Sequence, residues 1–482
     1  MLSPATMATD RISGLPDGIL HHVLSFLPLD GAVRTSVLSS RWRRLWCSNP
    51  VLRFKFSFDE SDNRDVASIV DHCLHVCSPI PKLSSAIFPT HDAGDAVTRW
   101  IRFAAERAVE VLVIRRHYES PPFYLPPLLF ECSSISSLKI QCSRFPSPMP
   151  PVVLPSLQTL DFDRVDFSNG DLNALLACLP SLENLTLTLC RSVSRLAISS
   201  PVMRELVVHK CFGLGQFEIV SASNLRVLKY NGPLSILGPL NGIPNLEEAN
   251  LRSNESCNFN NRLQWEELIS TISGAKILCI DTWFLRFFLD LGTRRINAFN
   301  NLKDLHLWPI PNSFMGDSSS KSEPFTGASI RAFASALKSC PSLQLLCIHV
   351  FESRIAFFVS YVNRVDVVEE GEAENVEDDD DDDDPLEEFE GVGYTLPSLK
   401  MVNLIEYSGK RFENRLMRFL LDKAVNLQSM SLIYEPNGED KLHWMQQEVN
   451  SWRIASPTAC VSLSEYDDVC PKDEMFSNDE SD

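Results

Sequence analysis

The sequence has 482 residues, of which 44% are apolar and 22% are charged, and its formal net charge is −19. This length favours more than one structural unit, and the apolar share excludes a chain that is disordered throughout. The negative charge is concentrated, because 16 acidic and no basic residues lie in 365–390 and eight acidic residues with one lysine lie in 465–482. The rest of the chain is close to neutral and has no basic patch, which argues against nucleic acid as a partner.

The first residues lack the basic and apolar regions of a signal peptide, and no stretch of 18 apolar residues predicts a membrane span. The 14 cysteines are scattered singly, mostly inside apolar runs, which is typical of reduced and buried thiols. We therefore expect a protein of the nucleus and/or cytoplasm, without a membrane partner.

Residues 10–52 predict a compact unit of short helices. Pro16 suits a first helical turn, Pro28 ends the first helix, and Asp30 is a candidate N-cap of the second. Ser39 or Ser40 can cap a third helix. The apolar residues of the unit recur at helical spacing: they are Ile19, Leu20, Val23, Leu24, Leu27, Ala32, Val33, Val37, Trp42, Leu45 and Trp46.

This unit has only about 40 residues, a size at which a domain without further support is marginal. It nevertheless carries a wide apolar surface and two tryptophans. Such a surface either packs on the rest of the chain or binds another protein. The physical argument alone leaves both alternatives open.

The motifs of this unit resemble the F-box of plant F-box proteins with leucine-rich repeats. The resemblance rests on residues 10–20, 25–28, 32–36 and 38–46. It implies docking to a Skp-type adaptor, which joins the chain to a cullin-based ubiquitin ligase. The contact set that it implies includes residues that must instead form the core of the unit, and the sequence does not separate the two groups. The set is Leu15, Pro16, Ile19, Leu20, Val23, Leu24, Leu27, Pro28, Val33, Trp42, Leu45 and Trp46.

One phrase then recurs along the chain: an apolar residue, two residues of any kind, a second apolar residue, one of any kind, and a third apolar residue. Its clear copies start at Leu157, Leu182, Met203, Leu225, Leu302 and Leu343. Weaker copies start at Val109, Ile135, Leu246, Ala275, Leu399 and Leu427. The spacing from Val109 to Leu246 is typical of leucine-rich repeats, and later copies are separated by insertions.

A proline stands two residues before the phrase in six copies, which suits the entry to a strand. Segments between the phrases, such as 173–179 and 331–337, read as short helices. One strand and one helix per repeat predict an α/β fold: an N-terminal helical F-box followed by a curved leucine-rich-repeat solenoid with a parallel sheet. The alternative is an ordinary α/β domain, which twelve registered copies disfavour.

The C-terminal part, residues 396–404, 415–421 and 426–432, is similar to the FBD-type region of the same family. The usual basic and apolar ending of that region is replaced here by residues 437–440 and Trp444. We expect these divisions: a disordered N-terminus 1–9, the F-box 10–52, a connecting helical segment 53–104, the solenoid 105–364, an acidic disordered insertion 365–392, FBD-like final repeats 393–440, and a C-terminal segment with an acidic tail 441–482.

Few residues suggest chemistry. His72, Cys73, His75 and Cys77 are zinc-ligand types, but no second pair follows, and an amphipathic helix explains their spacing better. The sequence has no catalytic motif, so we expect no enzyme activity, no metal and no cofactor. The acidic run 378–384 favours a solvated loop, with a docking strip for a basic segment as the alternative.

The resemblance implies a substrate receptor whose repeats bind an unknown protein substrate. Candidate contacts at the solvent-side positions of the phrase are Asp161, Thr186, Lys229, His306 and Asn403, each of which can equally be a solvated polar residue. Two other functions stay open: an interaction scaffold without a ligase role, and a receptor that holds a small ligand on the concave repeat face.

Overall fold

The computed structural model divides the chain into two compact units. Unit 1 comprises Met1–Leu225 with Ile236–Ile243, and unit 2 comprises Arg226–Ser235 with Pro244–Asp482. The structure describes residues 12, 14–55, 66–77, 80, 82–90, 94–116, 123–167, 171–211, 213–240, 242–253, 262–281, 299–308, 333–334, 336–349, 395–434 and 439–465. The predicted N-terminus 1–9 and acidic insertion 365–392 lie outside these residues.

Unit 1 begins with a helical module, which comprises the described residues from 12 to 48. It contains α1 (Asp17–Ser25), α2 (Leu29–Arg34), the 3-10 turn η1 (Thr35–Val37), α3 (Trp42–Leu45) and the 3-10 turn η2 (Trp46–Ser48). Pro16 occupies the N-cap of α1. The prediction of Asp30 as an N-cap was wrong, because α2 begins one residue earlier and Pro28 stands at its N-cap. Arg41, rather than the predicted Ser39 or Ser40, stands at the N-cap of α3, although the Ser39 hydroxyl accepts the backbone N–H of Trp42 at 3.4 Å.

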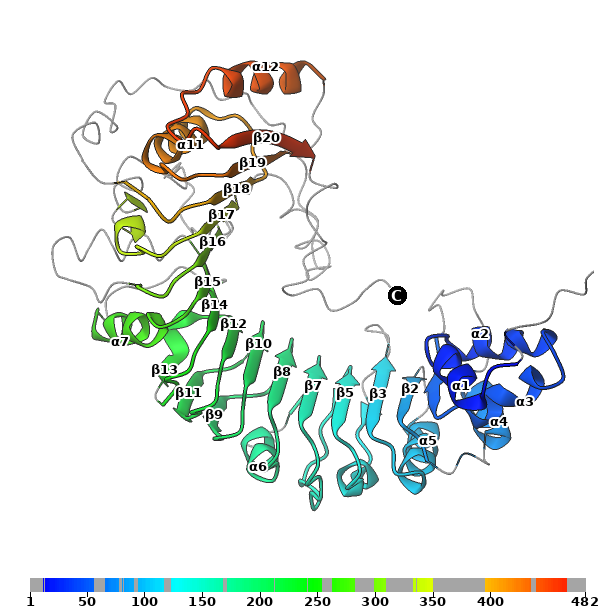
Figure 1. The fold of residues 1–482 in the computed structure, drawn as a ribbon. Helices are drawn as coiled ribbons and strands as arrows, with labels where there is room; N and C mark the ends of the chain where they lie inside the picture. Colours follow the sequence, from blue (N-terminus) through cyan, green and yellow to red (C-terminus); the bar gives the residue numbers. More distant parts are fainter. Residues whose placement is uncertain are drawn as a thin grey trace, which may run out of the picture. The chain divides into compact units, whose positions relative to one another are not determined.

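The sheet of unit 1 is parallel and follows the chain order. Its strands are β1 (Val51–Arg53), β2 (Ser85–Thr90), β3 (Val111–Arg116), β5 (Ser137–Gln141), β7 (Thr159–Asp163), β8 (Asn184–Thr188) and β10 (Glu205–His209). The central leucines of successive phrases, Leu160, Leu185 and Leu206, are register partners and are fully buried. The phrase thus stacks one leucine on the next. The strands of this unit follow one another in chain order (Figure 1), which confirms the leucine-rich-repeat architecture.

The predicted connecting helical segment, 53–104, contains two helices and also a strand of this sheet. It holds α4 (Val66–Val76), β2 and α5 (Gly94–Glu106), and β2 pairs with β1 and β3. Phe88 of β2 stacks on Trp100 of α5 with ring centroids 5.6 Å apart. The repeat sheet therefore starts before residue 105. The strand carries no leucine phrase, and Pro89 interrupts its β pattern.

The prediction of one helix in every repeat was also wrong. Helix α6 (Asp171–Ala177) confirms it for one repeat, but the next three carry a second strand instead. These strands, β9 (Arg195–Ser199), β11 (Gln216–Ser221) and β13 (Leu237–Leu240), form a small parallel sheet. Short elements complete the unit: β4 (Phe123–Tyr124) pairs with β6 (Ser143–Arg144), and η3 (Pro127–Glu131) is a 3-10 turn.

Unit 2 contains a second run of parallel strands. They are β12 (Val227–Asn231), β14 (Glu248–Arg252), β15 (Ile277–Asp281), β16 (Asp304–Trp308), β17 (Leu345–His349), β18 (Met401–Ile405), β19 (Ser429–Tyr434) and β20 (Cys460–Glu465). The described helices are α7 (Arg262–Ile272), α11 (Arg411–Lys423) and α12 (Glu439–Asn450), and the turn η4 (Leu234–Ile236) lies between the units in sequence. Strand β20 pairs with β19, so the sheet continues past the predicted end at 440.

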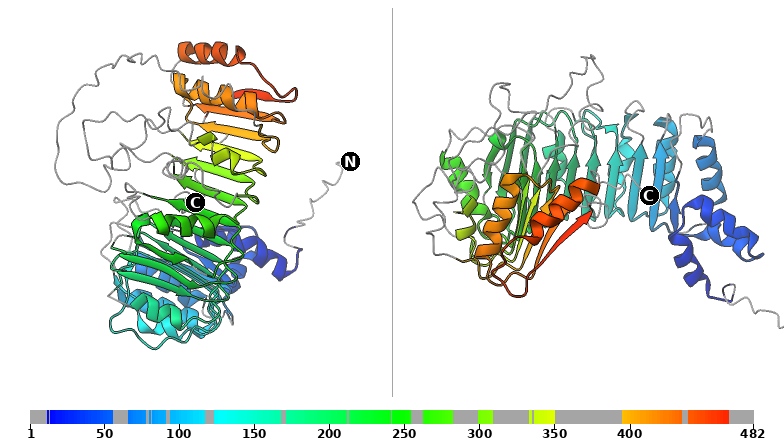
Figure 2. Two further views of the ribbon diagram at one scale, coloured as in Figure 1. Left: turned by 90° about the vertical axis from the view of Figure 1, so that its left-hand side faces the viewer. Right: turned by 90° about the horizontal axis from the view of Figure 1, so that it is seen from above.

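The parallel strands of the two units and their helices confirm the α/β class with an N-terminal helical module (Figure 1 and Figure 2). Among the described residues, no helix combines the length and the apolar character that a bilayer crossing requires.

Candidate protein-binding surface

The helical module has its own small core. Leu20 and Leu24 on α1 are fully buried and pack with Ala32, Trp42 and Leu45, while Leu27 and Trp46 are partly buried against them. Six residues of the predicted contact set therefore hold the module together: Leu20, Leu24, Leu27, Trp42, Leu45 and Trp46. The structure thus identifies which residues of the predicted set form the core of the module.

A second group of apolar side chains in the same module faces solvent. Four members of the predicted set belong to it: Leu15, Ile19, Val23 and Val33. Four others were not in the predicted set: Ile12, Phe26, Val37 and Leu38. Phe26 is 66% exposed and Val37 is 88% exposed, which is unusual for side chains of this size.

The two groups form two stripes on α1. Ile19, Val23 and Phe26 are spaced i, i+4, i+7 and lie on the solvent side of the helix. The buried stripe, shifted by one residue, is Leu20, Leu24 and Leu27. Both stripes are apolar, so periodicity alone could not show which stripe is buried and which is exposed. Phe26 was missed although it follows Ile19 at the spacing of a helix face.

The two prolines of the predicted set have positional roles. Pro16 is exposed directly before α1, and Pro28 is half-buried directly before α2. Each provides a fixed φ at the start of a helix. We call the eight exposed apolar residues together with Pro16 the exposed apolar set.

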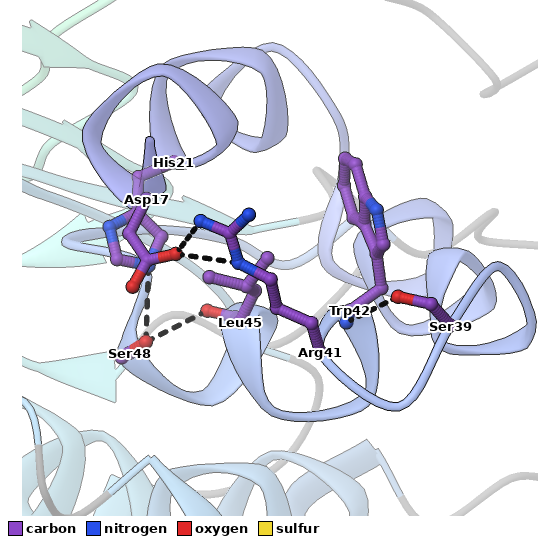
Figure 3. A network of polar contacts seen from close by, with 7 residues as sticks. All are labelled: Asp17, His21, Ser39, Arg41, Trp42, Leu45 and Ser48. Atoms are coloured by element: carbon purple, nitrogen blue, oxygen red, sulfur yellow. Dashed lines mark hydrogen bonds and ion pairs between the residues drawn. The ribbon is translucent and has the colours of Figure 1, made fainter. Parts of the chain in front are cut away.

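Polar contacts fix α1 against the third helix (Figure 3). Nε of Arg41 donates to the Asp17 carboxylate at 3.0 Å, and the two side chains form an exposed ion pair. Nε2 of His21 lies 3.1 Å from Oγ of Ser48, which donates to the Leu45 carbonyl at 3.1 Å. An exposed ion pair contributes only about 0.2–1 kcal/mol. The contacts therefore orient the helix more than they stabilise it.

The candidate substrate contacts on the repeats share strand positions within each unit. In unit 1, Asp161 and Thr186 are register partners, and Asp161 pairs with Lys139 at 3.0 Å. In unit 2, Lys229 pairs with Glu248 at 3.4 Å, and His306 and Asn403 both pair in register with Cys347 of β17. All five candidates are half-buried. Two of them already have ionic partners, which leaves them less available to a substrate.

His72, Cys73 and His75 lie on α4, as the amphipathic-helix prediction expected, and Cys77 directly follows the end of that helix. His72 and His75 are exposed, whereas Cys73 is half-buried and Cys77 is buried. Burial raises the pKa of Cys77 to about 12, so its thiol stays protonated near neutral pH. The thiols and the imidazoles thus face different environments.

Two family profiles match this chain. The F-box domain matches residues 12–54. The leucine-rich repeats of the FBD-associated F-box protein At5g56370 match residues 97–237. The first match covers the helical module with its exposed apolar set, and the second covers most of the unit 1 sheet.

Several curated relatives come from Arabidopsis thaliana. The F-box/FBD/LRR-repeat protein At2g04230 is 33% identical over 291 residues, which are 56% of this chain and 60% of that protein. The FBD-associated F-box protein At4g10400 is 29% identical over 316 residues, 62% of this chain and 71% of that protein. The F-box/LRR-repeat protein At3g26922 is 30% identical over 286 residues, 56% of this chain and 89% of that protein.

The fold, the helical module and these matches define a class of repeat protein with an N-terminal docking domain. The chain belongs to the plant F-box/LRR-repeat protein family. An F-box implies a Skp-type adaptor as its partner, and proteins of this family are typically non-catalytic adaptors of ubiquitin ligases.

Proposed function

We propose that this chain is the substrate-recognition subunit of a Skp–cullin–F-box ubiquitin ligase in the nucleus and/or cytoplasm. The exposed apolar set binds the Skp-type adaptor, the adaptor brings the chain to a cullin, and the repeats bind a protein substrate for ubiquitination. The chain itself does no chemistry. It raises the concentration of the substrate near the ubiquitin-loaded partner.

One observation carries this proposal: the module has a complete core and still exposes eight large apolar side chains. Full burial of such a side chain is worth about 1.5–3 kcal/mol, and roughly half of that remains available to each of these residues. Eight of them offer roughly 6–12 kcal/mol of gross binding free energy, before the entropic costs of association. These side chains can therefore supply a substantial part of the gross free energy of a protein–protein interface.

The test is capture of the full chain by a purified Skp-type adaptor. We expect Ile19→Asp with Val23→Asp to abolish capture, because both side chains are exposed and a carboxylate opposes burial in an apolar interface. Helical circular dichroism and thermal unfolding should be unchanged. Leu20→Asp is unsuitable as a test because Leu20 is core, and its loss would unfold the module.

The matched control is Val220→Asp with Val153→Asp, since both valines are about as exposed as Ile19 but lie on the repeats. Capture of the control variant should equal that of the unmodified chain. Undiminished capture of the Ile19 and Val23 variant would overturn the docking surface. Adaptor binding without co-purification of a cullin would favour a scaffold with no ligase role.

A further inference from the structure

Two adjacent strands of unit 2 bring three metal-ligating side chains together. His306 lies on β16, and Cys347 and His349 lie on β17. One donor atom from each of the three side chains can be chosen so that all lie within 4.8 Å of one another. Among the described residues, no other group of three or more His, Cys, Asp or Glu side chains meets this condition.

Strand geometry explains the convergence. His306 and Cys347 are direct register partners, and His349 follows Cys347 by two residues on the same face of β17. Leu307 and Ile348 point to the opposite face, into the core. The three donors therefore sit on a rigid pair of parallel strands rather than on a loop.

The distance between Cys347 and His349 suits a tetrahedral ion. Sγ of Cys347 lies 3.6 Å from Nε2 of His349. A tetrahedral zinc ion with Zn–S near 2.3 Å and Zn–N near 2.0–2.1 Å places sulfur and nitrogen about 3.6 Å apart. Two imidazoles and one thiolate form a donor set that zinc prefers, and the fourth position would be open to water or another ligand.

The surroundings hold the donors in place. The ring of His349 stacks on Trp308 with centroids 3.5 Å apart and an interplanar angle of 15°. Cys347 is only 4% exposed and packs with Ile405 and Ile433. Burial lowers the pKa of His306 and His349, which keeps both imidazoles neutral, the form that binds a metal.

One nearby charge opposes a cation. The guanidinium of Arg252 lies over the ring of Trp308 at 4.0 Å and adds positive charge near the three donors. Nε of Arg252 is 3.6 Å from the Asp281 carboxylate, which offsets part of that charge. The thiolate that would form on metal binding adds a negative charge to the site.

We propose that His306, Cys347 and His349 form a zinc-binding site that joins β16 to β17. On binding, the Cys347 thiol loses its proton to solvent and its sulfur bonds to Zn²⁺. The site would join two strands whose phrases stand 41 residues apart in sequence, from Leu302 to Leu343.

The test is titration of the metal-depleted full chain with Co²⁺ alone in a thiol-free reductant. We expect one equivalent to bind with a thiolate-to-cobalt charge-transfer band and the visible bands of a tetrahedral ion, and Zn²⁺ to displace it. In Cys347→Ser the charge-transfer band should disappear and the affinity should fall by more than about 10- to 100-fold, the usual loss for a second-shell change. Cys460→Ser, the same substitution at an exposed cysteine of β20, is the matched control and should behave like the unmodified chain.

Zinc-edge X-ray absorption on the zinc-loaded unmodified chain gives a test that does not depend on a variant. We expect one sulfur near 2.3 Å and nitrogen or oxygen ligands near 2.0–2.1 Å. A shell of nitrogen and oxygen only would overturn the site. So would an unchanged charge-transfer band in Cys347→Ser, or the absence of a band in the unmodified chain.

Discussion

The division of α1 into a buried stripe and an exposed stripe can be tested with two neighbouring residues. Leu20 is fully buried, whereas Ile19 is 50% exposed, and both are large aliphatic side chains on the same helix. Leu20→Ala and Ile19→Ala remove similar amounts of apolar surface. Their effects should nevertheless differ in kind, because only Leu20 contacts the core of the module.

The magnitudes follow from burial. Leu→Ala at a buried position costs about 2–5 kcal/mol through lost transfer free energy and the cavity left behind. At the lower bound this raises the equilibrium constant for local opening about 30-fold, since about 1.4 kcal/mol is a factor of ten. Ile19→Ala should cost the free chain about 1 kcal/mol or less, and should weaken adaptor binding by about fivefold, because about half of its side-chain burial is left for the partner.

Hydrogen exchange followed by mass spectrometry is the suitable assay, since it reports on α1 peptides separately from the repeats. We expect Leu20→Ala to speed exchange of α1 amides by about 30-fold or more. Ile19→Ala should leave exchange nearly unchanged and reduce adaptor affinity. Equal acceleration by the two variants would refute the assignment of the stripes, as would protection of α1 that survives Leu20→Ala.

Three further predictions concern unit 2. Glu413→Ala should lower the stability of the last repeats by about 1–3 kcal/mol in urea unfolding, because the fully buried Glu413 carboxylate accepts backbone N–H groups at 2.8–3.2 Å at the start of α11. Gly409→Ala should lower the thermal midpoint measured by calorimetry, since Gly409 has φ +80° and an added Cβ would come within 2.6 Å of Trp444. In the control Gly274→Ala the added Cβ meets nothing within 4 Å, so the thermal midpoint should not fall. Burial raises the pKa of Asp281 to about 7, so the folded state binds a proton that the unfolded state lacks, and the free energy of unfolding falls as pH rises from about 4 to 7. Asp281→Asn should flatten that fall in unfolding measured from pH 4 to 8. An unchanged slope would contradict the role of Asp281 in this pH dependence.

The repeat strands were predictable because their buried apolar residues recur at a regular spacing. The phrases at Leu157 and Leu182 specify strands whose leucines stack in register, and the structure places β7 and β8 there. Strand β2 carries no such phrase, since its buried residues are Ala86 and Phe88, and only its pairing with β1 and β3 makes it a repeat strand. The second strands β9, β11 and β13 could not be predicted, because the spacing of the repeats is compatible with either a helix or a second strand between the phrases.

The residues of the candidate sites could not be assigned from the sequence either. Ile19 and Leu20 are equivalent in sequence, and only the position of Trp42 and Leu45 decides which of them is covered. The zinc donors His306 and Cys347 are 41 residues apart, a spacing that no local motif captures. The local His/Cys cluster at 72–77, which did attract attention, lies on a helix that turns its imidazoles and thiols to different sides.

The junction between the helical module and the sheet bears on how the proposed receptor works. Only Asn49 and Pro50 separate η2 from β1, and Asn49 is 1% exposed and accepts the backbone N–H of Val51 at 3.3 Å. The Pro50 carbonyl accepts the backbone N–H of Ser84, directly before β2, at 2.8 Å. The module therefore passes into the first strand of unit 1 without a flexible linker. We therefore expect the proposed receptor to carry its docking module directly before its first repeat strand rather than at the end of a long linker.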